Sequence, residues 1–351
     1  MERLGWQDGL ARIEAAIKSG IVPDLCELGS TWMPHLLATQ QLADWSAGVA
    51  DLRSHVRGWE LCSVGDAVYG VPWMLGTRAL FFNKTLFARA GLDSTRPPQT
   101  WAELYADAEA IQRLGGAVRG FGVQTGERAV LFKKFMPFAW GNGGKILTDD
   151  LAGAVFDSPQ NREALEFYLS LRRVGVLDRQ AALDRSFRAG TLGLELSGAW
   201  MFPSIARESP RLRYGVALVP RPDVEHGTHA SFAGGELLAS FQGSHRKAWA
   251  LELARFLARP ENAVALAKAA GSVQPAVVGA DTILWYRQHP EQQTMIRQFE
   301  TAVPAPNHPA WTDLEAIIED EVDLALHDSK NAAQAVADAN RKIAARLGAR
   351  H

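Results

Sequence analysis

The chain of 351 residues is poor in cysteine, and it has no apolar segment approaching the roughly 20 residues that a membrane-spanning helix needs. Its two cysteines, Cys26 and Cys62, form neither a CxxC motif nor a zinc-ligand spacing, so they provide no zinc site and no disulfide framework, although one Cys26–Cys62 bridge stays open. Cys26 lies in an apolar run, which favours a buried free thiol. The first eight residues lack the basic and apolar regions of a secretory leader.

An excess of charge of one sign is also missing. The 37 Lys and Arg residues against 39 Asp and Glu residues leave a formal net charge of −2, which excludes the basic field of a nucleic-acid-binding protein or of a protein held on anionic lipid. Apolar residues make up 47% of the chain and charged residues 22%, as in ordinary folded proteins. At about 150 residues per domain, the length favours two domains or lobes.

The signatures of several enzyme classes are absent: the sequence contains no HExxH, GxSxG, GxxxxGK[ST] or DxDxDG motif. His226 and His229 have no third ligand nearby, so we expect neither a metal nor a cofactor. Glu195 ends a predicted strand and Glu236 follows a glycine turn. This pair leaves open an alternative function, a glycan-acting hydrolase or lyase that uses two carboxylates, although structural or ligand-binding roles are more typical of such residues.

Helical and strand-like segments alternate along the chain, which indicates an α/β protein. The spacing of apolar residues predicts short buried strands that are separated by amphipathic helices. The clearest strands are 67–73, 79–83, 191–196 and 214–219, and the clearest helices are 10–18, 33–42, 127–140 and 247–257. We expect Ser30 or Thr31 to cap the helix that begins near Met33.

Tryptophan is unusually frequent, with 11 residues against 5 tyrosines, and several tryptophans lie at strand ends or beside turns. Ligands of α/β sheets bind outside the carboxyl ends of the strands, so such indoles can converge on one site. An indole face packs well against the C–H face of a sugar, and nearby polar groups can bind its hydroxyls. The candidate sugar-binding residues are Trp32, Trp73, Arg78, Asn142, Trp200, Glu236 and Trp311.

Five segments and the C-terminal helices resemble, in order, the extracellular solute-binding proteins of carbohydrate ABC importers, the group that includes the maltose-binding proteins. The resemblance covers essentially the whole chain, and each motif is degenerate by itself. The matching segments are 19–25 (SGIVPDL), 69–73 with 80–84 (YGVPW and LFFNK), 98–104 (PQTWAEL), 187–200 (FRAG to SGAW), 234–235 with 247–261 (GG and the helix ending RPE), and 311–347.

This resemblance implies a two-lobe periplasmic-binding-protein-like fold of type II, in which crossing hinge strands join the lobes and the ligand lies in the cleft between them. It places the first lobe at 1–75 and 235–303 and the second at 76–234 and 304–351. It implies that Trp200, in the GxW motif, stacks on the sugar. The expected function is that of the substrate-binding component of an ABC importer, which captures a di- or oligosaccharide and delivers it to the membrane permease without catalysis.

Further expectations follow from the same resemblance. The protein is expected to be a monomer that is periplasmic, or extracellular and lipid-anchored, and to bind no nucleic acid. The family opens with a strand, a long helix and a second strand before the segment that residues 6–20 match, and we expect this chain to lack them. A second alternative keeps the fold but replaces the sugar with a non-sugar solute such as a polyamine, a phosphate ester or a metal chelate.

Overall fold

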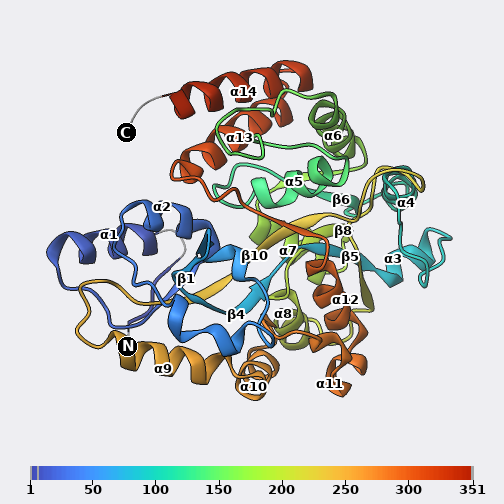
Figure 1. The fold of residues 1–351 in the computed structure, drawn as a ribbon. Coiled ribbons are helices and arrows are strands. Elements are labelled where there is room, and N and C mark those ends of the chain that lie inside the picture. The colour runs from blue at the N-terminus through green and yellow to red at the C-terminus, as the bar shows by residue number, and fades with distance from the viewer. Residues whose placement is uncertain (1, 6–7, 349–351) are drawn as a thin grey trace.

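The computed structural model describes residues 2–5 and 8–348. Two five-stranded sheets carry separate hydrophobic cores, which confirms the predicted α/β fold with two lobes (Figure 1). One core draws its buried residues from 13–75, 233–276 and Phe299, and the other from 80–232 and 310–343. Within the described residues, no helix combines the length and the apolar character needed to cross a membrane.

The first lobe is built on a sheet of order β1-β10-β4-β11, and β12 pairs with the beginning of β10. Cys26 and Cys62 are buried in this lobe as free thiols, which confirms the burial predicted for Cys26. The strands are β1 (Cys26–Gly29), β10 (Ser231–Ala239), β4 (Val71–Gly76), β11 (Gln274–Pro275), β12 (Ala302–Pro304) and the hairpin β2 (Ser63–Val64) and β3 (Ala67–Val68). The helices in the ranges predicted for this lobe are α1 (Gly9–Ser19), α2 (Met33–Ala38), α9 (Lys247–Ala258), α10 (Pro260–Ala270), α11 (Leu284–Arg287) and α12 (Pro290–Phe299).

The second lobe is built on a sheet of order β7-β6-β8-β5-β9. The strands are β5 (Ala79–Asn83), β6 (Arg119–Gln124), β7 (Gly175–Asp178), β8 (Leu192–Ser197) and β9 (Tyr214–Ala217). The helices are α3 (Lys84–Arg89), α4 (Trp101–Gln112), α5 (Phe132–Gly141), α6 (Pro159–Ser170), α7 (Gln180–Arg188), α8 (Met201–Glu208), α13 (Trp311–Leu326) and α14 (Ala332–Gly348). Strand β5 reads as a continuous apolar run because Leu80 and Phe82 enter one core and Ala79 and Phe81 enter another.

Local side-chain chemistry sets where several helices begin. Thr100 and Glu103 form a reciprocal capping box at α4, in which Glu103 Oε2 accepts from the Thr100 N–H at 3.1 Å. The prediction that helix 127–140 begins near residue 127 is wrong, since α5 begins at Phe132. The reason is tertiary: Glu319 on α13 accepts from the backbone N–H groups of Ala129 and Phe132 at 3.0 and 3.1 Å, and it thereby supplies the missing cap.

The predicted cap of α2 is also wrong. A 3-10 turn, Ser30–Trp32, precedes α2, and neither Ser30 nor Thr31 caps that helix. The Ser30 hydroxyl instead accepts from the Gly235 N–H on β10 at 3.2 Å. The turn after β1 is therefore tied to the strand beside it rather than to the helix that follows.

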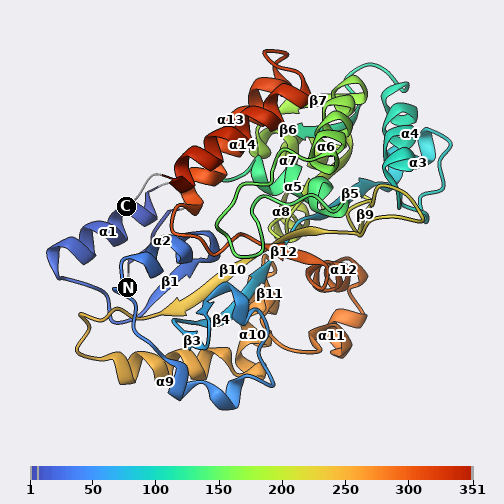
Figure 2. The same cartoon turned by 45° about the horizontal axis from the view of Figure 1, so that its top comes forward.

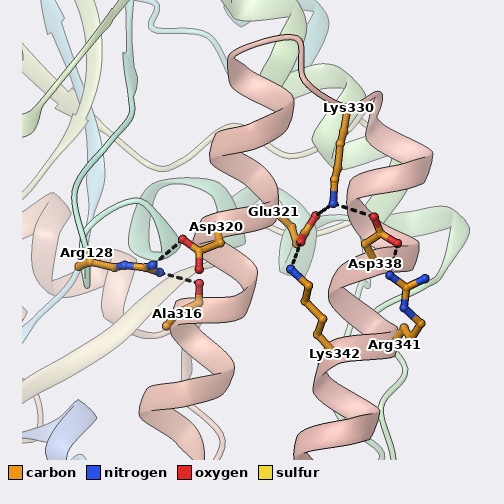
Figure 3. Close-up of polar contacts among 8 residues, drawn as sticks. All are labelled: Arg128, Ala316, Asp320, Glu321, Lys330, Asp338, Arg341 and Lys342. Atoms are coloured by element: carbon orange, nitrogen blue, oxygen red, sulfur yellow. Dashed lines mark hydrogen bonds and ion pairs between the residues drawn. The ribbon is translucent and has the colours of Figure 1, made fainter.

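The C-terminal helices α13 and α14 pack as an antiparallel pair over the second lobe (Figure 1). Glu321, almost fully buried between them, accepts hydrogen bonds from the ammonium groups of Lys330 and Lys342, and Lys330 also contacts Asp338 at 2.7 Å (Figure 3). Two lysines therefore neutralise one buried carboxylate, which fixes the register of the helix pair.

Strands β4 and β10 lead out of the first sheet toward the second lobe, and they are tied together at the junction (Figure 2). The Thr77 hydroxyl donates to Ser231 Oγ at 3.0 Å, and the Ser231 hydroxyl donates to the carbonyl of Arg78 at 2.6 Å. Helix α12 spans the same junction, since its Met295 packs in one apolar cluster with Phe81 of β5. The lobe boundaries given above stay predictions.

Candidate ligand-binding site

The indole of Trp200 lies where β8 ends and α8 begins, and the local sequence determines its orientation. The ring folds back over Gly198: a Cβ atom at that position would lie 1.9 Å from the Trp200 Cζ3 atom. The indole Nε1–H donates to Asp184 Oδ2 on α7 at 2.8 Å. Glycine therefore provides the space for the ring, and the Asp184 carboxylate holds its edge.

The guanidinium of Arg78 stacks on the Trp200 ring, with Cζ 4.6 Å from the ring centroid. Its Nη1 donates to the carbonyl of Thr77 at 3.1 Å, and it lies 5.9 Å from the ring of Phe232 on β10. Burial lowers the pKa of Arg78 to about 10, and the nearby Glu236 and Asp184 oppose this shift. Arg78 therefore stays protonated at neutral pH and places one positive charge at the junction of the lobes.

Two further charged groups at this junction make no ion pair within 4.0 Å and no side-chain hydrogen bond to another described residue. These are the ammonium of Lys133 on α5, 5.1 Å from the Phe232 ring, and the carboxylate of Glu236 on β10. Burial raises the pKa of Glu236 to about 7, and Glu27 adds to this shift, whereas Arg78 and Lys133 oppose it. Charged groups without partners in a largely buried setting are costly, which is typical of groups that await a ligand.

Trp32 and Trp73 lie in the first lobe near Glu236. Glu236 pairs with Gly29 of β1 and with Met74 of β4; Trp32 lies in the turn after Gly29, and Trp73 precedes Met74 on its strand. Both rings are half-buried against the core of the first lobe. The Trp32 ring packs over Gly9 at the start of α1.

The structure places the other two candidates differently. Trp311 is fully buried in the second core, where its ring contacts Phe132 at a centroid distance of 5.0 Å. The Asn142 amide donates to the Gln160 carbonyl and to Glu163 Oε2, both at 3.0 Å, so its donors are used at the edge of α6. The candidates that the structure brings together are thus Arg78, Trp200 and Glu236.

Sequence reasoning missed Lys133, Asp184 and Phe232. One usable signal was present: Lys133 and Lys134 follow one another inside the otherwise apolar segment 131–139, and charged residues in such a run are rarely buried without a purpose. Asp184 lies in α7, a helix that was not predicted. Within the described part of the chain, no cluster of three His, Cys, Asp or Glu side chains could hold a metal ion.

A hollow of about 590 Å³ between α6 and the α13–α14 turn does not belong to this site. It lies on the second lobe, and three of the charged side chains that line it are already paired. Arg172 contacts Asp328 at 2.9 Å, and Lys330 contacts Glu321. The junction is therefore the better candidate for a ligand site.

Residues 1–294 match the family described as bacterial extracellular solute-binding protein. The chain belongs to this family. It is 29% identical over 266 residues to a binding protein of Brucella abortus, a match that covers 73% of this chain and 63% of that protein's length. It is 26% identical over 323 residues to the sn-glycerol-3-phosphate-binding periplasmic protein of Escherichia coli K12, which covers 86% of this chain and 73% of that protein.

Solved structures support the same fold. The cyclic α-maltosyl-1,6-maltose binding protein of Arthrobacter globiformis superposes with a TM-score of 0.86 at 27% identity, over 99% of this chain and 90% of that one. An ABC transporter solute-binding protein of Thermotoga lettingae, solved with α-D-tagatose, gives a TM-score of 0.87 at 25% identity, over 98% and 90%. The family and these neighbours are binding proteins, and the family is extracellular.

Proposed function

We propose that the protein is the substrate-binding component of an ABC importer, which captures a sugar of the di- or oligosaccharide class between its lobes and delivers it to membrane permease subunits. The observation that carries the proposal is the group formed by the Trp200 ring, the stacked Arg78, and the unpaired Lys133 and Glu236 at the lobe junction. An aromatic face binds the C–H face of a sugar, and charged groups without partners bind its hydroxyls strongly.

Arg78 occupies one face of the Trp200 ring in this structure. A sugar that stacks on that face displaces the guanidinium, which is then free to donate its N–H groups to sugar hydroxyls. Closure of the lobes around the sugar excludes water and strengthens those hydrogen bonds. We propose that the permease recognises this closed form, which the ligand favours by binding it more tightly than the open form.

The neighbouring carboxylates support binding rather than catalysis. Glu195 is completely buried inside the second lobe, so no substrate bond can reach it, and Glu236 belongs to the other sheet. A glycosidase needs two carboxyl groups on either side of one scissile bond. We therefore propose that the protein is not an enzyme, and release of reducing sugar from an oligosaccharide would contradict this.

A phosphate ester is the second candidate ligand, because three basic side chains, Arg78, Lys133 and Lys134, lie around Trp200 and Phe232. One relative is named for binding sn-glycerol 3-phosphate. A phosphate ligand would bind more weakly as salt concentration rises, whereas a neutral sugar would show little salt dependence. The two ligand classes are thus separable in one experiment.

The test is isothermal titration calorimetry of the full chain with maltose, cyclic maltosyl-maltose, D-tagatose and sn-glycerol 3-phosphate. We expect saturable binding of a saccharide, and we expect Trp200→Ala to weaken it about tenfold or more, which corresponds to about 1.4 kcal/mol. Trp249→Ala is the matched control, because Trp249 is 77% exposed on α9. Equal weakening by both variants, or no saccharide binding, would contradict the proposal.

The proposed site of action is outside the cytoplasmic membrane, either in the periplasm or at the cell surface on a lipid anchor, and the proposed binding unit is a monomer. The assignment to an extracellular family supports this location. Sedimentation velocity of the purified chain tests the monomer, and a dimer that persists at micromolar concentration would contradict it.

A further inference from the structure

The carboxylate of Asp184 holds Trp200 from the side that faces the protein core. Asp184 is 6% exposed on α7, and its Oδ2 accepts from the indole Nε1–H at 2.8 Å. Its Oδ1 accepts from Gln180 Nε2 at 2.5 Å and from the Ser197 hydroxyl at 3.0 Å. The orientation of the ring in the candidate site thus depends on where this one carboxylate points.

A second carboxyl group, that of Glu195, lies beside Asp184: Glu195 is on the same face of β8 as Ser197, whose hydroxyl donates to Asp184 Oδ1. Glu195 is completely buried on β8, and neither of its carboxyl oxygens has an assigned hydrogen-bond partner among the described residues. On the two flanking strands it lies opposite Phe81 and Gly122, which offer no charge. Two ionised carboxylates side by side in this buried setting would repel each other.

The charged groups that face Glu195 come from two helices. Asp184 and Arg188 approach from α7, and Lys134 approaches from α5, where its ammonium donates to the carbonyl of Leu196. Burial, followed by the Asp184 charge, holds the pKa of Glu195 well above its ordinary value, although Lys134 and Arg188 oppose the shift. A neutral Glu195 has one O–H donor, and Asp184 is the acceptor beside it.

We propose that Glu195 is a positioning residue of the ligand site: its protonated carboxyl donates to Asp184 and keeps the Asp184 carboxylate aimed at the Trp200 indole N–H. The consequence for ligand binding rests on the proposed function, whereas the hydrogen-bonded chain from Glu195 to Trp200 does not. Glu195 touches no ligand and acts only through Asp184.

The same arrangement sets the direction of a pH effect. Since the pKa of Glu195 is raised in the folded protein, its contribution to stability is fully present below the ordinary pKa of glutamate and is lost as pH rises through the raised value. Deprotonation also places a second negative charge beside Asp184. The Trp200 indole is then expected to be released as pH rises through the raised pKa of Glu195.

The experiment follows the indole N–H signals of the full chain, labelled with ¹⁵N-tryptophan, by NMR without any ligand. The Trp200 signal is assigned with Trp200→Phe. Glu195→Gln retains an N–H donor to Asp184 and is expected to leave the Trp200 signal and its hydrogen exchange near those of the parent. Glu195→Leu removes the donor and is expected to shift the signal and to speed its exchange about tenfold, as for the loss of one charge-assisted hydrogen bond.

The matched control is Glu315→Leu on α13, because Glu315 is also buried, with one carboxyl oxygen unpaired and a pKa raised by burial to about 7. This variant is expected to leave the Trp200 signal unchanged. The proposal is overturned if Glu195→Leu leaves Trp200 as protected as in the parent, or if Glu195→Gln disturbs it as much as Glu195→Leu does.

A pH titration of the parent keeps the proposal testable if Glu195→Leu does not fold. The Trp200 signal of the parent is expected to move with the titration of one group on the alkaline side of the ordinary glutamate pKa, and this movement should be absent in Glu195→Gln. A titration that persists unchanged in Glu195→Gln would overturn the proposal. Because no sugar is added, failure of sugar binding and failure of the positioning role remain distinguishable.

Discussion

Gly198→Ala is the sharpest test of how the Trp200 ring is held. The added methyl group would lie 1.9 Å from Cζ3, 2.4 Å from Cε3 and 2.5 Å from Cη2 of the indole, all far below van der Waals contact. The backbone at Gly198 is not in the left-handed region, so alanine is acceptable there except for the ring. The substitution therefore acts first on the Trp200 ring, which supplies the three nearest atoms.

The protein then has two responses, and the less costly one determines the loss of stability. If the ring stays, overpacking costs about 1–3 kcal/mol. If the ring moves away, the hydrogen bond to the charged Asp184 is lost at about 1.5–3 kcal/mol, and the Arg78 contact at about 0.5–2 kcal/mol. We expect Gly198→Ala to lower the free energy of unfolding by about 2–3 kcal/mol through one of these two routes.

The assay is urea denaturation followed by circular dichroism, applied to a double-mutant cycle with Trp200→Ala. In the Trp200→Ala background the methyl group meets no indole, so Gly198→Ala should cost nothing or should stabilise by about 0.4–1 kcal/mol. The coupling energy is then about 2–4 kcal/mol. The same cost in both backgrounds, or a cost in the parent below about 0.5 kcal/mol, would refute the reasoning about the ring.

Three further predictions concern groups elsewhere in the fold. Because the pKa of Glu236 is raised from 4.5 to about 7, stability from its neutral form is present below pH 4.5 and is lost as pH rises through about 7. In Glu236→Gln, the free energy of unfolding should therefore fall by on the order of 2 kcal/mol less between pH 4.5 and pH 7 than it does in the parent, as measured by urea denaturation at several pH values. The same pH dependence in the variant and the parent would argue against a raised pKa at Glu236. Glu321→Gln leaves Lys330 and Lys342 without their shared buried carboxylate and should lower the free energy of unfolding by about 2 kcal/mol in the same assay (Figure 3). The control is Asp320→Asn, which removes the exposed ion pair with Arg128 and should lower it by less than about 0.5 kcal/mol. Equal costs would show that the helix pair does not depend on Glu321. Thr100→Ala breaks the capping box of α4 and should lower the free energy of unfolding by about 1 kcal/mol, with a lower melting temperature. An unchanged melting temperature would contradict the role of the cap.

Local sequence was sufficient to predict the elements whose conformation is determined by residues close to them in the sequence. Strand β5 is the predicted 79–83, since five consecutive apolar or capping residues end at Asn83, whose side chain then caps α3. The start of α5 could not be predicted in this way. Its cap is Glu319, which lies 187 residues beyond Phe132 in the sequence.

The site shows the same division. The tryptophan in the SGAW segment was identified from its place after a strand, and Arg78 and Glu236 were identified as polar side chains that can bind sugar hydroxyls. Which of the candidates meet depends on tertiary packing: Trp311, equally well placed by a proline turn, is enclosed by Phe132 in the core. Asp184 could not be found from local sequence, because its role depends on Trp200 lying 16 residues away at the end of another element.

The most direct test of the central claim is a crystal structure of the full chain with the saccharide that binds most tightly in the calorimetric panel. The account predicts one sugar at the lobe junction, with a ring on the Trp200 indole, Arg78 moved off that face, and hydroxyls within hydrogen-bond distance of Glu236 or Lys133. A sugar bound elsewhere, touching neither Trp200 nor Glu236, would contradict it.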